Sequence, residues 1–201
     1  MKFFIAILSL FLILTSCVEK REIRQLPLDQ FAEGDLAFRC GRGFMSKAVT
    51  AVEDEGLYSH VGLVVRENGK WMIVHAVPAE PDFKGDFDRV KKDEPDVFYS
   101  HDRASSGCLV HTGLKDSVLI RAICKDALSY ACDSVLFDND YDLEDSTAFY
   151  CTELVWRLYN KAGIDLSEGR RRFVNLFHIK GDVILPEHLF KYSDNNPYFK
   201  F

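Results

Sequence analysis

Two apolar segments separated by a short turn constrain the fold of this chain most. Residues 60–65 read HVGLVV and residues 71–77 read WMIVHAV, and both are rich in the β-branched residues that favour strands. Between them, Asn68-Gly69 is one of the strongest short-range signals for a two-residue turn. The sequence therefore predicts an antiparallel β-hairpin with an apolar character on both of its faces.

The register of this hairpin decides where its two histidines point. If Glu67 faces Lys70, His60 lies opposite Val77 and shares a face with His75, because side chains alternate along a strand. The two imidazoles would then be diagonal neighbours within side-chain reach. A three-residue loop would instead place them on opposite faces. A single histidine at such a position is most often structural, but two on one face indicate a site.

The rest of the chain combines further strands with helices. Residues 78–106 are rich in charge, proline and glycine and indicate a long surface excursion. Mixed order without regular βαβ alternation favours an α+β fold. From periodicity and stop signals we expect strands at 34–40, 107–114 and around 183–185, and helices at 44–52, 116–137, 151–162 and after Pro186.

The amino terminus has the pattern of an export signal. Residues 3–14 form an apolar run behind Lys2 that is far shorter than the roughly 20 residues of a membrane-spanning helix. Residues 14–17 read LTSC, which resembles the bacterial lipoprotein signal and implies cleavage after residue 16 and lipid attachment at Cys17. The alternative is an ordinary signal peptide with an incidental cysteine.

These features predict the organisation and location of the protein. Residues 1–16 are expected to be a lipoprotein signal peptide, residues 17–30 a linker to the lipid, and residues 31–201 one domain in the bacterial cell envelope, anchored to a membrane. The 25 Lys and Arg against 31 Asp and Glu give a net charge of -6, so nucleic acid is not an expected partner. The oligomeric state is left open.

Cys151 is the leading candidate for a reactive residue. It begins the predicted helix CTELVWRLYNKAG, and unpaired N–H groups and the helix dipole at such a position favour a thiolate and lower the pKa of a thiol. A nucleophilic thiolate needs a base within hydrogen-bond reach, and the base needs a third group to fix its tautomer. Cys151, His60 and His75 can fill these roles in that order, although a buried structural cysteine or a metal site formed by the same residues is an alternative.

Four segments resemble one family. GDLAF at 34–38, YSHVGLVV at 58–65, VHAVP at 74–78 and YCTELVW at 150–156 resemble the circularly permuted papain-like amidases of YaeF/YiiX type in the NlpC-like superfamily. The order matches the permuted branch, since His60 precedes Cys151. The resemblance implies a permuted papain-like fold, with an antiparallel sheet packed against helices and the nucleophile at a helix N-terminus.

The resemblance also implies roles for individual residues. Cys151 would be the nucleophile and His60 the general base, oriented by His75, where some relatives have Glu. Tyr141 is the best match to a family tyrosine that lines the site near the oxyanion, although an aromatic residue in this acidic loop could also be a lid or a packing residue. The backbone N–H of Cys151 would be the other oxyanion donor. No metal and no cofactor are expected.

The leading hypothesis is therefore a lipid-anchored cysteine hydrolase that cleaves an amide through a thioacyl intermediate. Its substrate would be either a cell-wall peptide or an N-acyl, lipid-like amide. An acyltransferase on the same scaffold is one alternative, and a non-catalytic lipoprotein that binds lipid or peptide is another. The weaker base-orienting capacity of His75, compared with a carboxylate, favours the latter.

The remaining cysteines, histidines and arginines are expected to be structural. An exported protein permits disulfides, and four cysteines allow three pairings, but most are expected to be small core residues: Cys40, Cys108, Cys124 and Cys132. Four histidines show no metal-ligand spacing: His101, His111, His178 and His188. The triplet at 170–172 indicates a solvated basic loop.

Overall fold

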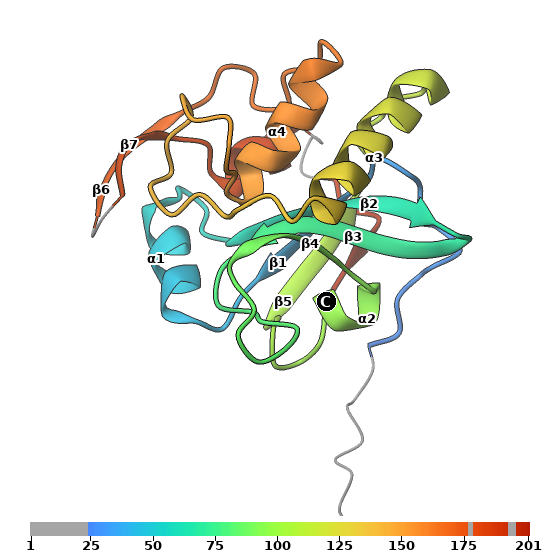
Figure 1. Ribbon diagram of the computed structural model, residues 1–201, viewed down its shortest axis with the longest axis horizontal. Coiled ribbons are helices and arrows are strands. Elements are labelled where there is room, and N and C mark those ends of the chain that lie inside the picture. Colours follow the sequence, from blue (N-terminus) through green and yellow to red (C-terminus); the bar gives the residue numbers. More distant parts are fainter. Residues whose placement is uncertain (1–23, 177–178, 193–195) are drawn as a thin grey trace, which may run out of the picture.

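The computed structural model describes residues 24–176, 179–192 and 196–201, and these form an α+β fold (Figure 1). A six-stranded antiparallel sheet has the order β4-β3-β2-β1-β5-β8, and β6 and β7 form a separate hairpin. The elements are β1 (Leu36–Cys40), α1 (Phe44–Val52), β2 (His60–Glu67), β3 (Lys70–Val77), β4 (Arg89–Asp93), α2 (Pro95–Phe98), β5 (Ser106–Val110), α3 (Ser117–Cys132), α4 (Cys151–Lys161), β6 (Arg172–Leu176), β7 (Ile179–Val183), α5 (Pro186–Tyr192) and β8 (Phe199–Lys200).

Some residues for which the sequence makes a prediction are not among the described residues. The expected signal peptide, Cys17 and His178 lie outside them. Among the residues that are described, no helix combines the length and the apolar character that crossing a bilayer requires.

The β2–β3 hairpin has the predicted register. Glu67 pairs with Lys70 and Leu63 pairs with Val74. Asn68 and Gly69 have φ angles of 50° and 81°, the left-handed pair that a tight two-residue hairpin turn requires. His60 and His75 therefore share one face of the sheet, as expected.

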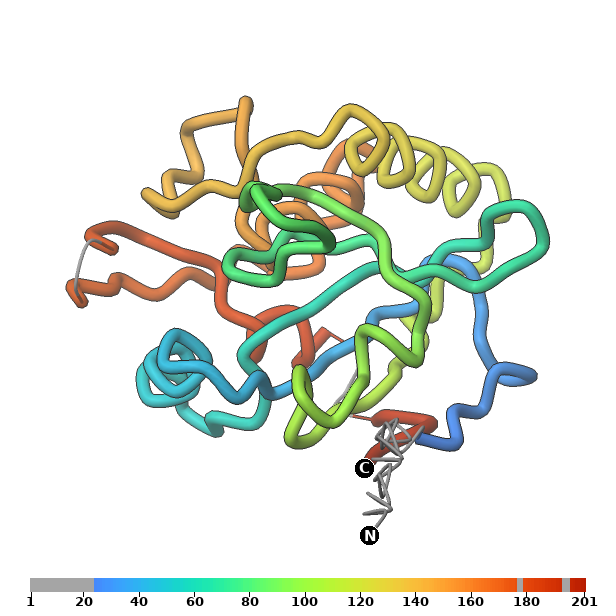
Figure 2. The backbone as a smooth tube through the Cα atoms, turned by 60° about the horizontal axis from the view of Figure 1, so that its bottom comes forward, coloured from blue at the N-terminus to red at the C-terminus, as the bar shows by residue number. Residues whose placement is uncertain are grey.

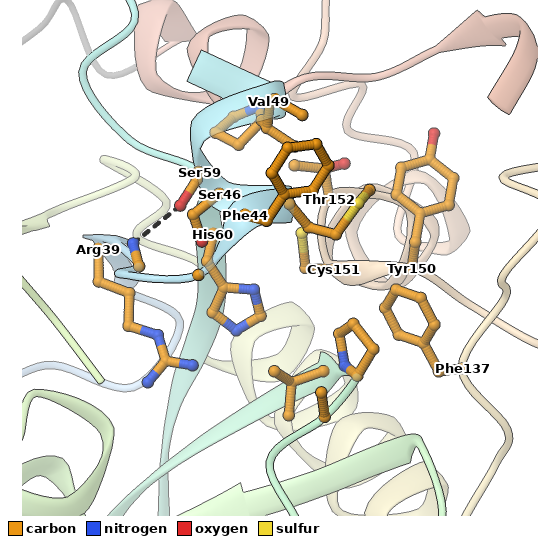
Figure 3. Close-up of a pocket in the computed structure, with 18 of the residues that line it drawn as sticks. Arg39, Phe44, Ser46, Val49, Ser59, His60, Phe137, Tyr150, Cys151 and Thr152 are labelled. Carbon is orange, nitrogen blue, oxygen red and sulfur yellow. Dashed lines mark hydrogen bonds between the residues drawn. The ribbon is translucent and has the colours of Figure 1, made fainter. Parts of the chain in front are cut away.

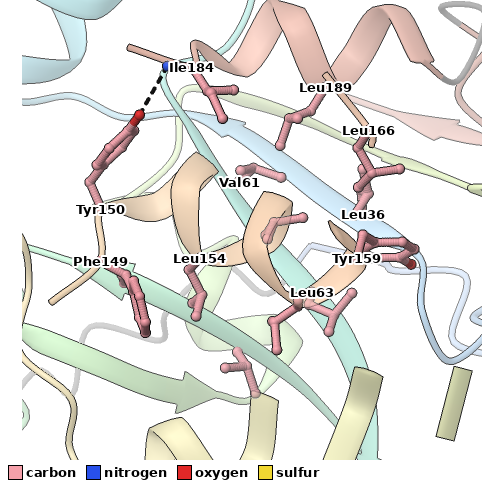
Figure 4. Packing of buried hydrophobic residues seen from close by; sticks show 14 of the residues in the cluster. Leu36, Val61, Leu63, Phe149, Tyr150, Leu154, Tyr159, Leu166, Ile184 and Leu189 are labelled. Atoms are coloured by element: carbon pink, nitrogen blue, oxygen red, sulfur yellow. Dashed lines mark hydrogen bonds between the residues drawn. The ribbon is translucent and has the colours of Figure 1, made fainter. Parts of the chain in front are cut away.

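Helix α4 is held against the sheet by its apolar stripe. Figure 1 shows α3 and α4 over one face, with α2 on the other side. Leu154 and Leu158 of α4 are almost fully buried and pack in one cluster with Leu36 and Leu63 of the sheet (Figure 4). At the start of α4, Glu153 completes a capping box with Tyr150. These contacts fix Cys151, the first residue of α4, over the sheet.

A smaller apolar cluster covers the opposite face and receives the first described residues. Phe98 and Tyr99 form its centre. The Arg24 guanidinium donates to the Tyr99 and Ala104 carbonyls, both at 2.9 Å, and lies 3.8 Å from the Phe201 ring centroid. In Figure 2 the first blue residues accordingly run beside the red C-terminal segment. Arg24, within the predicted linker, therefore contacts the domain.

Residues 78–106 are not only a surface excursion, contrary to the prediction. They contain β4, which extends the sheet beyond β3, and the buried start of α2. β4 reads RVKKD and contains a single apolar residue, so alternation did not reveal it. Its charged side chains are instead satisfied by ion pairs, such as Lys92 with Glu67 at 2.5 Å.

Three further boundaries differ from the prediction. β5 ends at Val110 rather than near residue 114. α3 ends at Cys132 rather than near residue 137, because Asp133 caps the helix and Ser134 turns away with a φ of 52°. The expected strand around 183–185 is instead the second strand of the β6–β7 hairpin, which ends at Val183. The short helix after Pro186 is confirmed as α5.

Candidate active site

Cys151 and His60 meet where α4 begins above the start of β2. Cys151 is the first residue of α4 and His60 is the first residue of β2. The Cys151 sulfur lies within hydrogen-bond reach of the backbone N–H of Val61, one residue after His60. In Figure 3 the Cys151 sulfur and the His60 ring border the same cavity. The structure thus brings together residues that are 91 positions apart in the sequence.

His60 continues into a chain of buried hydrogen bonds. Its Nε2 lies 2.9 Å from Nδ1 of His75, and Nε2 of His75 lies 3.1 Å from Oδ2 of Asp93 on β4. His75 is completely buried and His60 is 7% exposed. The imidazole that neighbours the thiol is therefore held by a second imidazole, which is in turn held by a carboxylate.

The order of donors and acceptors assigns the tautomers. A carboxylate only accepts hydrogen bonds, so His75 donates from Nε2 to Asp93. Nδ1 of the neutral His75 ring is then an acceptor, and His60 donates to it from Nε2. The remaining nitrogen of His60, Nδ1, carries a lone pair. This is the tautomer that can take a proton from a thiol.

Electrostatics keep this chain in the required charge state. Burial by itself would raise the pKa of Asp93, but the hydrogen bond from His75 and the charges of Lys91 and Arg103 outweigh it and lower that pKa. Burial lowers the pKa of His75 and lowers that of His60 strongly. Asp93 is thus ionised at neutral pH and both imidazoles are neutral.

The thiol differs from the sequence-based expectation. Burial raises the pKa of Cys151 to about 11, and the backbone N–H groups of Val61, Thr152 and Cys151 itself only partly oppose this. The prediction of a lowered thiol pKa is therefore wrong, because desolvation outweighs the helix start. The resting site pairs a neutral thiol with a neutral imidazole.

Beside His60 lies a buried charged group that the sequence analysis did not identify. The Arg39 guanidinium donates to the Phe98 carbonyl at 2.8 Å and forms an ion pair with Glu80. Arg103 lies 2.5 Å from Asp93 and 3.3 Å from Glu80, and so links this pair to the hydrogen-bond chain. The positive charge of Arg39 adds to burial in lowering the pKa of His60.

No sequence signal pointed to these residues. Asp93 and Glu80 lie in the charge-rich stretch that was interpreted as a surface excursion. The spacing of Asp93 from Lys91 could have indicated Asp93. The two lie two positions apart and therefore share one face of β4, next to His75. That spacing indicates a partner for His75 only when β4 is known to pair with β3.

Tyr141 lies in the wall of the cavity that Cys151 and His60 also line. Its ring centroid is 5.0 Å from that of Tyr150. Tyr150 in turn accepts the backbone N–H of Ile184 through its hydroxyl at 3.0 Å. Tyr141 has a φ of 56°, a left-handed conformation that is uncommon for a residue with a large side chain.

The other candidate residues lie elsewhere. Five cysteines of the described residues are free thiols, so the disulfide alternative does not apply to them: Cys40, Cys108, Cys124, Cys132 and Cys151. Nδ1 of His111 lies 2.8 Å from Asp35, and Nδ1 of His188 accepts the N–H of Leu185. Arg172 is not in a solvated loop but begins β6, where it lies 2.7 Å from Asp54.

Comparison with known proteins relates the chain to a solved structure. No model of a protein family and no curated protein matches it. The crystal structure of the metalloprotein YiiX from Escherichia coli O157:H7, DUF1105, matches with a TM-score of 0.62 and 20% sequence identity. The match covers 80% of this chain and 92% of YiiX. The chain therefore has a YiiX-like α+β fold.

Proposed function

We propose that this protein is a cysteine hydrolase that cleaves an amide bond through a thioacyl intermediate at Cys151. The observation that carries the proposal is the hydrogen-bond chain from Asp93 through His75 to His60, which lines the same cavity as Cys151. A chain that fixes this tautomer of His60 supplies what a general base needs, which supports catalysis over binding alone.

The reaction divides into two steps. Cys151 attacks the amide carbonyl while His60 Nδ1 takes the thiol proton, and the new S–C bond gives a tetrahedral oxyanion. The C–N bond then breaks, and His60 donates the proton to the leaving amine. Water, deprotonated by His60, then attacks the thioester carbonyl, the C–S bond breaks to release the carboxylic acid, and His60 returns the proton to the Cys151 sulfur.

The charge that develops on the way has partners in this site. Proton transfer makes His60 cationic, and the Asp93 carboxylate, acting through His75, stabilises that cation. The oxyanion would be held by the backbone N–H of Cys151, and Tyr141 lines the same cavity. Because the resting thiol is neutral, its deprotonation and its attack on the substrate occur together.

The proposal also covers the arrangement of the fold and the location of the protein in the cell. The YiiX-like fold, with His60 before Cys151 in the sequence, supports a circularly permuted papain-like arrangement. The LTSC sequence at residues 14–17 supports lipid attachment at Cys17 and a place on a membrane of the cell envelope. An N-acyl amide or a cell-wall peptide would be the substrate.

The test uses the full-length protein and a panel of fluorogenic amides. Cys151→Ala should abolish turnover and covalent labelling by a thiol-reactive acyl probe. Cys132→Ala, which removes an exposed thiol, is the matched control and should leave both unchanged. Undiminished turnover in Cys151→Ala would contradict the proposal.

A lipoprotein that binds its ligand without reaction is the second candidate, and the raised thiol pKa favours it. The two candidates differ in one measurement. A hydrolase releases amine from the amide at a rate that depends on Cys151, whereas a binding protein retains the intact amide with equal affinity in the wild type and in Cys151→Ala.

YiiX is described as a metalloprotein, which raises the question whether His60, His75 and Cys151 of this chain could bind a metal ion. Both nitrogens of His75 are already engaged, by His60 and by Asp93. Across residues 24–176, 179–192 and 196–201, no group of three or more His, Cys, Asp or Glu side chains could hold a metal ion. The donor set does not fit a metal centre, and no step of the proposed reaction uses one.

A further inference from the structure

Residues 98–104 cover the hydrogen-bond chain of the candidate active site. His75 shares a face of β3 with Ile73, which belongs to the smaller apolar cluster on the α2 side of the sheet (Figure 1). The Phe98 ring is completely buried, and its centroid lies 5.0 Å from that of His75 and 5.7 Å from that of His60. The first residue of this segment therefore packs against both imidazoles.

The other end of the segment holds the carboxylate of the chain. The Arg103 guanidinium lies 2.5 Å from Asp93. Hydrogen bonds close the backbone between the two ends, because the N–H groups of Arg103 and Ala104 both donate to the Ser100 carbonyl, at 3.0 and 2.9 Å. A displacement of the segment would thus move Phe98 and Arg103 together, relative to the imidazoles and the carboxylate.

Arg24 binds the outer side of the same segment. Its Nε donates to the carbonyl of Tyr99 and its Nη2 donates to the carbonyl of Ala104, each at 2.9 Å. Tyr99 directly follows Phe98, and Ala104 directly follows Arg103. Because the donors of a guanidinium form a planar, fixed fork, one side chain of the linker sets the spacing between the two ends of the segment.

The Phe201 ring holds the Arg24 guanidinium in place. Its centroid lies 3.8 Å from the guanidinium carbon and 5.3 Å from the centroid of Tyr99. The backbone of Phe201 pairs with Gly107 of β5 in both directions, at 3.0 and 3.3 Å. A Cβ at Gly107 would come within 2.8 Å of the Phe201 and Tyr99 rings, so glycine is what lets these rings approach the strand. Arg24 is thus connected to the sheet as well as to the segment.

We propose that Arg24 is a positioning residue of the candidate active site. With the linker docked, Arg24 holds residues 98–104 against the imidazoles and the carboxylate of the hydrogen-bond chain. With the linker released, the segment has more freedom, and His60 spends less time in the tautomer that takes the thiol proton. The linker toward the proposed lipid thereby sets the activity of Cys151, although Arg24 touches no reacting atom. This inference rests on the proposed function.

The first test is steady-state kinetics of full-length variants on a fluorogenic amide that the wild type turns over. Arg24→Ala should lower kcat by about 5- to 150-fold, the usual range of coupling between two sites, with little change in KM. Arg24→Lys keeps the charge but has no planar fork to span both carbonyls, so it should restore only part of the loss.

Arg66→Ala is the matched control. Like Arg24, Arg66 donates to a backbone carbonyl and lies over an aromatic ring, that of Trp71. Arg66 is exposed and lies near the β2–β3 turn, at the other end of the strand from His60. Arg66→Ala should therefore have the kcat and KM of the wild type.

NMR shifts of the imidazole nitrogens distinguish positioning from a general effect on stability. In the wild type, His60 and His75 should each show a protonated Nε2 and an unprotonated Nδ1. Arg24→Ala should average these signals between the two nitrogens of each ring, and hydrogen exchange should become faster in residues 98–104. Phe201→Leu removes the ring beside Arg24 but keeps an apolar side chain. It should give smaller changes in the same direction and replaces Arg24→Ala if that variant does not fold.

The outcomes separate this inference from the proposed function. If folded Arg24→Ala keeps the kcat and the imidazole signals of the wild type, Arg24 has a structural role at most, and the inference is wrong while the hydrolase proposal stands. A kcat that falls only with the fraction of folded protein has the same meaning. If the signals change but the wild type turns over no amide, Arg24 positions the chain and the hydrolase proposal is wrong. Unchanged signals together with an inactive wild type would overturn both.

Discussion

Asp93 lies at the end of the hydrogen-bond chain farthest from the thiol, and it controls the tautomer of His60 without touching the substrate. In Asp93→Asn the side-chain amide can donate to Nε2 of His75, which moves the His75 proton to Nδ1. His60 must then accept at Nε2 and carry its proton on Nδ1, where the lone pair is needed. We expect kcat to fall by about 10²- to 10⁴-fold with little change in KM.

Steady-state kinetics on a fluorogenic amide that the wild type turns over, and the pH profile of this activity, check this positioning role. Asp96→Asn, at an exposed position of the adjacent α2, is the control and should behave like the wild type. A purely structural role for Asp93 would lower the fraction of folded protein but leave kcat per folded molecule unchanged. That outcome would contradict the tautomer assignment.

Glu53 should make stability depend on pH. Burial raises its pKa from 4.5 to about 8, with a further contribution from the charge of Glu187, although Glu53 also accepts the backbone N–H of Glu187. Because the folded-state pKa lies above the unfolded value, this stabilisation is fully present below about pH 4.5 and is lost as the pH rises toward 8.

Urea denaturation across this window measures the effect. Glu53 should lower the free energy of unfolding of the wild type with rising pH by up to ~1.4 kcal/mol per unit, and Glu53→Gln should remove this contribution while that of Glu153, whose pKa burial raises to about 7, remains. Glu55→Gln, a change at an exposed neighbour, should retain it. The same slope in the wild type and in Glu53→Gln would assign the pH dependence to another group.

At the scale of the element, local sequence patterns were enough to predict helix α4. The apolar periodicity of α4 and the glycine after its end predicted both boundaries, which the structure confirms to within one residue. β4 was not predicted, because a strand with one apolar residue shows no alternation of apolar and polar residues. Its place was decided by pairing with β3 and by ion pairs that form only in the folded sheet.

A substitution at Gly163 tests how the backbone conformation after α4 contributes to stability. Gly163 has a φ of 80°, and a Cβ added there would meet no atom within 4 Å, so the cost of Gly163→Ala is backbone strain alone. We expect the free energy of unfolding to fall by about 1–2 kcal/mol. Gly181→Ala, where a Cβ also meets nothing but φ is not left-handed, is the control and should be neutral. Equal stability of the two variants would contradict this account.

At the scale of the whole molecule, the domain should be held close to a membrane. The contacts of Arg24 leave only seven peptide units between residue 24 and the proposed lipid on Cys17, a span of at most about 25 Å when fully extended. We expect labelled palmitate to be incorporated into the wild type and the protein to fractionate with membranes. Cys17→Ala should lose both properties, whereas Cys40→Ala should retain them. Labelling of Cys17→Ala would place the lipid elsewhere.

The sequence by itself determined the hairpin, its register and the shared face of His60 and His75, because turn chemistry and alternation are local properties of the chain. It also determined Cys151 as the start of a helix. Only the tertiary structure decided that Asp93 completes the hydrogen-bond chain, that Arg39 and Glu80 flank it, and that burial raises rather than lowers the pKa of the thiol. Strand pairing, desolvation and the shape of a cavity depend on segments far apart in sequence, and no local pattern records them.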